Sequence, residues 1–461
     1  MSLQEIELVA GLGMEAAKSG YPAFEAWVSA TFPSAFTFLA WQLYRLFSGD
    51  MLLGALKARQ RLLAPFTLEY LFARVPPPLP AERRAEVLVT FFPYRQDYAG
   101  LLAPVEEELQ RRGVRVANLL PPEARDPGLP GVSLSLGSYA DMRSYAFARR
   151  RWRELSGQVR RFADERSLSA QGRTTLTLLV KNYLWQEAAA RAALAAERPR
   201  VVLGLHYMTD PGVRGAIDLH RRAGERVPVV LLQHGLFSGD WPTHDFHGAD
   251  LVMLWGESSR SELARFPDAP HAVVVGNPRL GALEAHAPEP TFTVLYAGTN
   301  GDKEEGRKAL HMALEALRGL PGVTLRVRPH PKESRATYDE AVEMGLLARD
   351  QIDDAADPYD AVRGASVVLG TASTLLPEAV ALGVPAVLVA DAAGDTWWSP
   401  RLLRASTPAQ LREVVSGLVR DAAYRAETLG RERAVAEDAF GDPSHAAAAA
   451  ADAVLELMER R

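Results

Sequence analysis

A series of short, continuous apolar segments, each running into a polar or glycine-containing loop, most constrains the fold of this chain. Strands that are apolar at nearly every position are typical of parallel sheets covered on both faces by helices. The first series comprises Glu86–Phe92, Val114–Leu120, Val201–Leu205, Val227–Leu232, Leu251–Trp255 and Ala272–Val275. Helical patterns separate several of these segments, as in successive β-α-β units. We therefore expect a Rossmann-like sheet in this part of the chain.

A second series of the same kind begins after the proline- and alanine-rich residues 281–290, which are typical of a hinge between domains. Its strands are expected at Phe292–Tyr296, at Val323–Val327 and from Val367 and Ala386 onwards. Earlier in the chain, the proline-rich residues 76–80 exclude helix and predict a linker. The fold class is therefore α/β, with two sheet domains and a helical N-terminal extension over residues 1–80.

Composition excludes several classes of protein. The chain has 461 residues, 48% of them hydrophobic and 24% charged, which favours a well-cored globular protein of two or three domains. Its formal net charge of −5 argues against a nucleic-acid partner. The absence of cysteine excludes disulfides and thiolate chemistry. No apolar run reaches the ~20 residues that span a bilayer, and residues 1–10 lack a secretory signal pattern. We expect a cytoplasmic location.

Two segments leave a choice between a structural and a membrane-surface role. Apolar and aromatic residues crowd Phe36–Phe47, which favours a helix buried between other helices; the alternative is shallow insertion at a membrane interface. The basic run at Arg149–Arg153, continued by Arg160 and Arg161, is typical of a solvated helix face. The alternative is docking to an anionic lipid, at the inner face of the membrane, or to a phosphorylated acceptor.

The loops of the second series carry the chemistry. Arg328-Pro329-His330-Pro331 holds a guanidinium and an imidazole at a stiff strand exit, which suits an anionic ligand such as a diphosphate. The structural alternative is a histidine that binds a neighbouring backbone group. Gly298 and Thr299 lie in the loop after the first strand of this series. All these side chains are expected at the carboxyl ends of strands, where open α/β sheets bind ligands.

The loop after the Val367 strand leads directly into a helix. Thr371, Ser373 and Thr374 precede this helix and Glu378 lies about one turn inside it. Hydroxyls and free N–H groups at a helix start bind phosphate, and a glutamate here can accept hydrogen bonds from a ribose diol. The alternative is plain helix capping, with an acid favoured by the helix dipole.

These motifs resemble those of bacterial GT-B glycosyltransferases of surface-polysaccharide pathways. The resemblance is to the capsule-synthesis (Kdo-transferase-like) group, to sialyl- and polysialyltransferases, and to CDP-glycerol glycerophosphotransferases. The residues that carry it are His330, Pro331, Ser373, Thr374, Glu378, Ala379, Gly383 and Pro385. It covers roughly residues 201–390. It implies two Rossmann-like domains facing a cleft, a donor site that uses the His-Pro motif, and no bound metal or other cofactor.

The resemblance also implies a domain division and a catalytic base. Residues 81–280 form the acceptor domain, residues 281–440 the nucleotide-sugar donor domain, and residues 441–461 a helix that packs back on the first domain. Gln233-His234-Gly235 is similar to the His-Gly loop of CDP-glycerol transferases, although Gln233 and Leu236 depart from the usual pattern. His234 is therefore one candidate base, and Asp97 is a second.

The expected function is transfer of a sugar from a nucleotide-activated donor to a glycan or carrier-lipid-linked acceptor. Three alternatives remain open at this point. A non-hydrolysing UDP-sugar 2-epimerase shares the fold, but its Ser-Gly-Gly loop is absent from this chain. A phosphotransferase that uses a CDP-polyol and a non-catalytic GT-B binding protein are the others. His244, Asp245 and His247 lie close together in sequence but lack matching partners for a metal site.

Overall fold

The computed structural model describes residues 84–90, 98–120, 128–165, 170–205, 211–236, 249–265, 269–283, 291–298, 303–330, 333, 335–354, 357–371, 373–389 and 397–460. The expected helical extension over residues 1–80 lies outside them. The chain divides into two compact units. One consists of Met1–His234, Pro242–Val252 and Ala451–Arg461, and the other of Gly235–Trp241 and Met253–Ala450.

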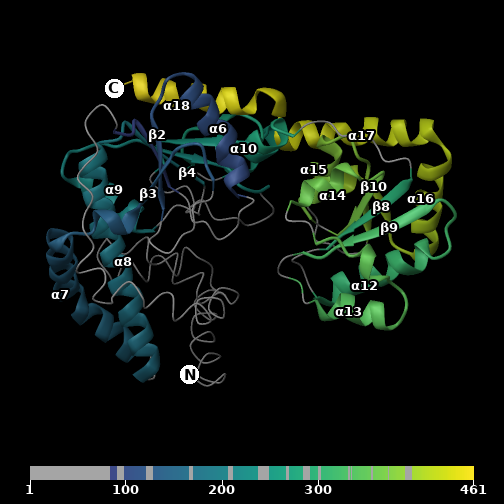
Figure 1. Ribbon diagram of the computed structural model, residues 1–461, viewed down its shortest axis with the longest axis horizontal. Helices are drawn as coiled ribbons and strands as arrows, with labels where there is room; N and C mark the ends of the chain where they lie inside the picture. The colour runs from purple at the N-terminus through teal and green to yellow at the C-terminus, as the bar shows by residue number, and fades with distance from the viewer. Residues whose placement is uncertain are drawn as a thin grey trace. The chain divides into compact units, whose positions relative to one another are not determined.

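A seven-stranded sheet occupies the first part of the chain (Figure 1). Its strands are β1 (Val87–Thr90), β2 (Val116–Leu120), β3 (Val132–Ser135), β4 (Val201–Leu205), β5 (Val229–Leu232), β6 (Leu251–Leu254) and β7 (Ala272–Val274). Their order is β3-β2-β1-β4-β5-β6-β7, and β1 runs parallel to both β2 and β4. Every residue of β1, β2, β4, β5 and β6 is buried, which explains their continuous apolar sequences.

The helices that follow these strands are α6 (Ala99–Arg111), α7 (Met142–Glu165), α8 (Ala170–Glu197), α9 (Pro211–Arg222), α10 (Glu257–Leu263) and α11 (Pro278–Gly281). The long helices α7 and α8 pack side by side (Figure 1). A buried ion pair links them, since Arg151 Nε lies 3.8 Å from Glu187 Oε1. Helix α9 packs against α8 in turn.

A five-stranded sheet forms the core of the second unit. Its strands are β8 (Phe292–Ala297), β9 (Val323–Arg328), β10 (Val367–Gly370), β11 (Ala386–Val389) and β12 (Leu403–Ala405), in the order β12-β11-β10-β8-β9. All neighbouring pairs run parallel. The helices of this unit are α12 (Lys303–Leu317), α13 (Ala336–Glu343), α14 (Pro358–Arg363), α15 (Leu375–Ala381), α16 (Pro408–Arg420) and α17 (Ala422–Phe440). The last helix, α18 (Ala446–Glu459), belongs from Ala451 onwards to the first unit.

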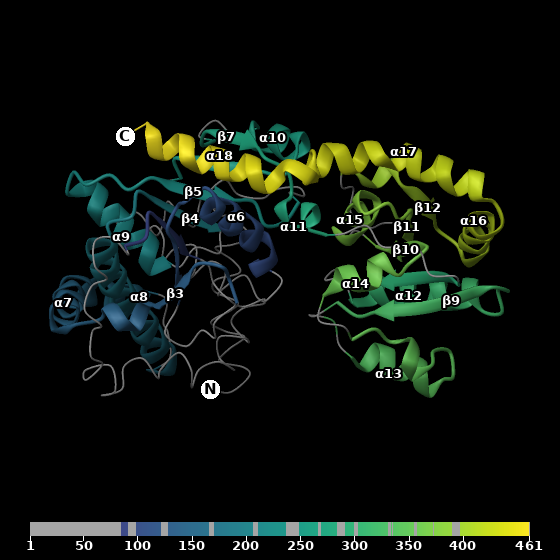
Figure 2. The same cartoon turned by 45° about the horizontal axis from the view of Figure 1, so that its top comes forward.

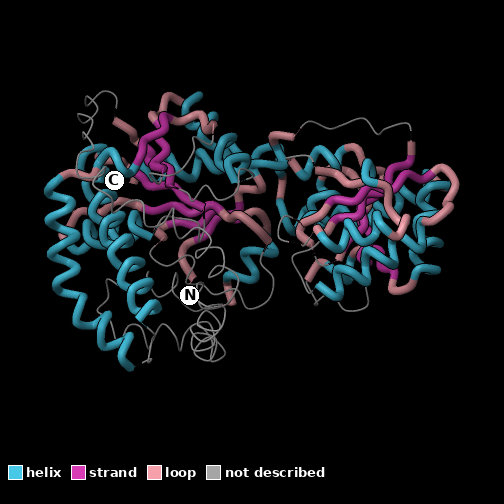
Figure 3. The backbone as a smooth tube through the Cα atoms, turned by 60° about the horizontal axis from the view of Figure 1, so that its bottom comes forward, coloured by secondary structure: helices cyan, strands magenta, loops and turns pink. Residues whose placement is uncertain are grey.

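Helices cover both faces of this second sheet (Figure 3). One cluster of buried side chains joins the strands to α12 and α16. Helices α15 and α17, which contact each other, lie side by side in Figure 2. The α/β fold class with two Rossmann-like sheets, expected from the apolar segments, is thus confirmed.

Candidate functional site

The candidate site lies at the carboxyl ends of β8, β9 and β10. The chain leaves β8 to build β9 on one side and then returns to build β10 on the other. Open α/β sheets bind ligands at such a reversal of strand order, outside the carboxyl ends of the strands. Gly298 follows β8, His330 follows β9 by two residues, and Thr371 follows β10. The topology therefore brings three of the predicted loops to one sheet edge.

A single carboxylate fixes the loop after β9. Glu333 accepts hydrogen bonds from the His330 backbone N–H at 2.8 Å and from the Tyr338 hydroxyl at 2.5 Å. Burial, followed by this hydrogen bond, raises the pKa of Tyr338, so its hydroxyl keeps its proton. Gly298 donates its N–H to Arg328 O at 2.8 Å. A Cβ at Gly298 would lie 2.7 Å from His330 N, so only glycine fits there.

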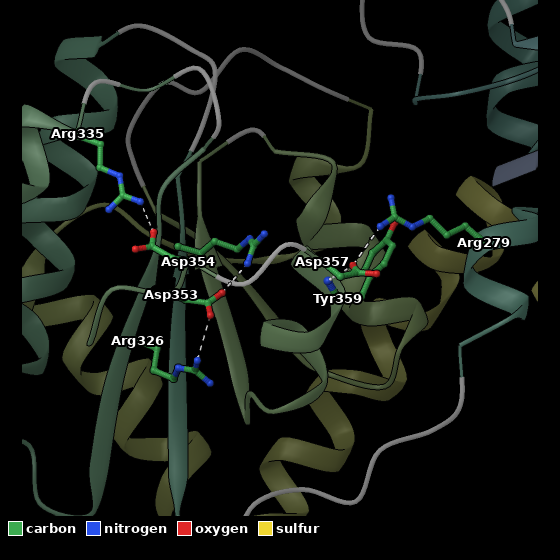
Figure 4. A network of polar contacts seen from close by, with 8 residues as sticks. Arg279, Arg326, Arg335, Asp353, Asp354, Asp357 and Tyr359 are labelled. Carbon is green, nitrogen blue, oxygen red and sulfur yellow. Dashed lines mark hydrogen bonds and ion pairs between the residues drawn. The ribbon is translucent and has the colours of Figure 1, made fainter. Parts of the chain in front are cut away.

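Arg328 is paired rather than free for a ligand. Its Nη1 lies 2.5 Å from Asp353 Oδ2, and Arg326, two residues earlier on the same strand face, lies 3.1 Å from Asp353 Oδ1 (Figure 4). The Asp353 side chain is 4% exposed and that of Arg328 is 13% exposed. One buried carboxylate thus offsets part of the positive charge expected to face a diphosphate. Asp353 was not among the residues selected from the sequence.

Of the three hydroxyls predicted after β10, that of Ser373 bonds to the start of the following helix. Thr371 is buried. Ser373 Oγ accepts a hydrogen bond from Leu375 N–H at 3.3 Å, and Ser373 O accepts one from Leu376 N–H at 3.1 Å. Thr374 is exposed and makes no side-chain cap. Two N–H groups of the first turn of α15 are therefore already bonded, as the capping interpretation of this loop predicts.

Glu378 belongs to a buried polar network that the sequence did not reveal. The Tyr359 hydroxyl bonds to the Glu378 carboxyl group, and both residues are buried. Burial, together with the nearby Glu378 charge, raises the pKa of Tyr359 well above its ordinary value. The Arg279 guanidinium lies 4.3 Å from the centre of the Tyr359 ring and forms a 3.0 Å ion pair with Asp357 (Figure 4). Asp357 in turn accepts a hydrogen bond from Tyr359 N–H at 2.9 Å and begins α14.

The two candidate bases belong to the first unit. His234 follows β5 by two residues and is half-buried, and its ring and that of Tyr98 form a T-shaped pair with 5.4 Å between centroids. Asp97 and Thr299 lie outside the described residues, as do His244, Asp245 and His247. No group of three potential metal ligands occurs among the residues that the structure describes. Within the same residues, no helix is long and apolar enough to cross a membrane.

No protein-family model matches this chain, and no curated protein sequence matches it. Solved structures do. A protein from Listeria monocytogenes assigned as a UDP-N-acetylglucosamine 2-epimerase matches with a TM-score of 0.54 and 15% identity, over 82% of this chain and 98% of that one. The UDP-GlcNAc 2-epimerase of Neisseria meningitidis, solved with UDP-GlcNAc bound, matches with a TM-score of 0.51 and 13% identity, over 81% of this chain and all of that one (100%).

At these identities the likeness shows the fold alone. The chain has a GT-B-like fold, which it shares with these two structures. The comparisons favour no particular group of glycosyltransferases.

Proposed function

We propose that the protein is a glycosyltransferase that moves a sugar from a nucleotide-activated donor to a surface-polysaccharide or carrier-lipid-linked acceptor. The observation that carries this proposal is the Glu378 carboxyl group, held by the Tyr359 hydroxyl at the edge where the strand order reverses. An ionised carboxylate has about four acceptor positions, so it can accept hydrogen bonds from more than one hydroxyl, as binding of a ribose diol requires.

The remaining donor contacts follow from the loops at the same edge. Glu333 fixes the backbone of His330, and the proposal assigns contact with the donor diphosphate to the imidazole on this loop. Arg328, Thr371, Ser373, Thr374, Gly298 and Thr299 complete the proposed donor set. In this proposal, residues 281–440 form the donor domain, residues 81–280 the acceptor domain, and residues 441–461 brace the acceptor domain. No metal is required, as in GT-B transferases generally.

The proposed base is His234 or Asp97, which would take the proton of the acceptor hydroxyl. Replacing the true base should lower turnover while nucleotide binding persists. His234→Asn and Asp97→Asn, assayed separately, distinguish the two residues.

A UDP-sugar 2-epimerase is the second candidate, and the similarity to the Neisseria meningitidis enzyme bound to UDP-GlcNAc favours it. Against it, Ala372-Ser373-Thr374 stands in place of the Ser-Gly-Gly loop expected before the ribose glutamate. Inversion at C2 must break the C2–H bond, so an epimerase incorporates deuterium there from heavy water without any acceptor. A transferase leaves C2 unlabelled. NMR of a UDP-GlcNAc incubation makes this distinction.

The donor site is tested by thermal denaturation with UDP, CMP, CDP, GDP and dTDP. We expect one nucleotide to raise the melting temperature of the unmodified protein, and His330→Ala and Glu378→Gln to abolish most of that rise. Two exposed residues of the same types provide matched controls, His271→Ala and Glu413→Gln. Equal stabilisation of the His330 and Glu378 variants would contradict the proposed donor site, and stabilisation by none of the nucleotides would favour a non-catalytic protein.

A further inference from the structure

Helix α7 carries a row of arginines on the side opposite its buried face. Its buried residues include Ser144, Leu155 and Val159. Arg149, Arg153 and Arg160 are all exposed. Their spacings of four and seven residues place them on one helix face, within about 20° of a common line, at 100° per residue. The row extends over roughly 16 Å at 1.5 Å per residue.

The charge of this row is not offset by nearby acids. Helix α7 contains seven arginines and three acidic residues, a net charge of +4, in a chain whose net charge is −5. Two of the acids are occupied: Glu154 pairs with Arg151 at 3.0 Å, and Asp164 pairs with Arg173 of α8. The outward row itself forms no ion pair with any acidic residue of the described ranges.

Other arginines of α7 have structural partners and are distinct from the row. Arg151 has a side chain that is only 17% exposed and reaches the buried Glu187. Arg150 lies 5.6 Å from the centre of the Phe147 ring, and Arg191 of α8 lies over the same ring at 4.9 Å. These contacts fasten α7 to α8. Among the side chains that the structure describes, the row shows no such contact with α8, and Arg160 donates only to Ser156 O of its own helix, at 3.2 Å.

Apolar side chains lie on the same outward side, at the amino-terminal end of the row. Met142 is 67% exposed and Tyr145 is 44% exposed. Met142, Tyr145 and Arg149 follow the spacing i, i+3, i+7, which places them along one side of the helix. Exposed apolar and aromatic residues beside aligned arginines are typical of helices that lie in the headgroup region of a membrane.

We infer that the outward face of α7, defined by Met142, Tyr145, Arg149, Arg153 and Arg160, is a docking surface for an anionic lipid bilayer. The arginines bind lipid phosphates, and Met142 and Tyr145 enter the boundary between headgroups and acyl chains. The three arginines lie along one line of the helix, and such a straight row of charges fits the extended anionic surface of a bilayer. Glu154 and Asp164 of α7 pair with Arg151 and with Arg173 of α8, so these two acids do not neutralise the row.

The inference is independent of the donor site and is tested on the full chain by sedimentation with vesicles. We expect binding to vesicles of phosphatidylcholine with 30% phosphatidylglycerol, weak binding to pure phosphatidylcholine, and release at 0.5 M salt. Each arginine near an acidic leaflet contributes about fivefold to affinity, so Arg149→Ala/Arg153→Ala/Arg160→Ala should bind on the order of 100-fold more weakly. Met142→Ser/Tyr145→Ser should weaken binding severalfold without changing its salt dependence.

The matched control is Arg318→Ala/Arg404→Ala/Arg433→Ala, which removes the same charge from exposed arginines elsewhere. It should bind vesicles nearly as well as the unmodified protein. Equal loss in the control, or equal binding to charged and uncharged vesicles, overturns the assignment to α7. Tighter binding to a soluble polyanion such as heparin than to the charged vesicles overturns the choice of a membrane as the partner. Circular dichroism establishes that the variants are folded.

Discussion

The arginines at the edge of the second sheet and those along α7 have opposite environments. Arg328 and Arg279 each have side chains less than 15% exposed and each pairs with an aspartate. Arg149 and Arg153 are exposed and pair with no acid of the described ranges. A paired, buried arginine holds local geometry and is little affected by salt. An unpaired row acts at longer range, and its effect is strongly salt-dependent. The same residue type therefore positions a site in one region and creates a surface field in the other.

The largest expected effect comes from removing the carboxylate that the two β9 arginines share. Asp353→Asn leaves the half-buried Arg326 and the more deeply buried Arg328 without their counter-charge. Breaking a buried pair from one side should lower the free energy of unfolding by about 4 kcal/mol. Urea denaturation measures it.

The neighbouring residue provides the control. Asp354 pairs with Arg335, and both side chains are more than half exposed. Asp354→Asn should cost less than about 1 kcal/mol. Similar losses in the two variants would remove the distinction between paired, buried arginines and exposed ones.

Glu432 is a buried carboxylate with no ion pair among the described residues, and its response to pH is opposite to that of an ion-paired acid. Glu432 accepts hydrogen bonds from Ala386 N–H at 3.0 Å and Leu403 N–H at 3.1 Å. Burial raises its pKa from 4.5 to about 7. The folded state then holds the proton more tightly than the unfolded state, so the stabilisation is complete below pH 4.5 and is lost as the pH rises towards 7.

The expected loss over this pH range is up to about 3 kcal/mol. Glu432→Gln keeps an acceptor and removes the titration, so the pH dependence of unfolding should become flatter. Glu106, on α6, gives an internal replicate, since its pKa is also raised to about 7 by burial. Unfolding free energies measured from pH 4.5 to 7.5 test both. An unchanged slope in Glu432→Gln would contradict the assignment.

Much of the fold was predictable because buried parallel strands have sequences that are apolar at nearly every position. The expected strand positions coincide with β1, β2, β4 to β11. The edge strands β3 and β12 were missed, since three of the four β3 residues are exposed and β12 has only three residues, one of them Arg404.

The candidate site was predictable only in part. His330 and Glu378 stand at positions fixed by local strand and helix patterns. The ion pairs around them join distant residues: Asp353 lies 25 residues from Arg328, and Arg279 lies 78 residues from Asp357. No local pattern encodes pairs formed by packing across the fold. The strand-end loops could thus be found from the sequence, whereas the network that orients them could not.

A smaller effect is expected from the network behind Glu378. Tyr359→Phe keeps the ring beneath Arg279 but leaves the buried Glu378 without the Tyr359 hydroxyl. The stability loss should be about 1–2 kcal/mol. If Glu378 binds the donor, the melting-temperature rise produced by the preferred nucleotide should also fall. Tyr424→Phe, on α17, is the control and should change neither quantity. A normal nucleotide response in Tyr359→Phe would show that Glu378 does not depend on this hydroxyl.

The smallest expected effect on stability comes from the α7 row. Arg149→Ala/Arg153→Ala/Arg160→Ala removes three charges that no acid compensates, so the free energy of unfolding should change by less than about 0.5 kcal/mol per site. At 20 mM salt the change should be slightly stabilising, because mutual repulsion along the helix is relieved. At 500 mM salt this gain should vanish, since the Debye length falls to a few ångströms. Urea denaturation at the two salt concentrations measures the difference. A loss as large as that of Asp353→Asn would mean that the row holds the fold together rather than facing a partner.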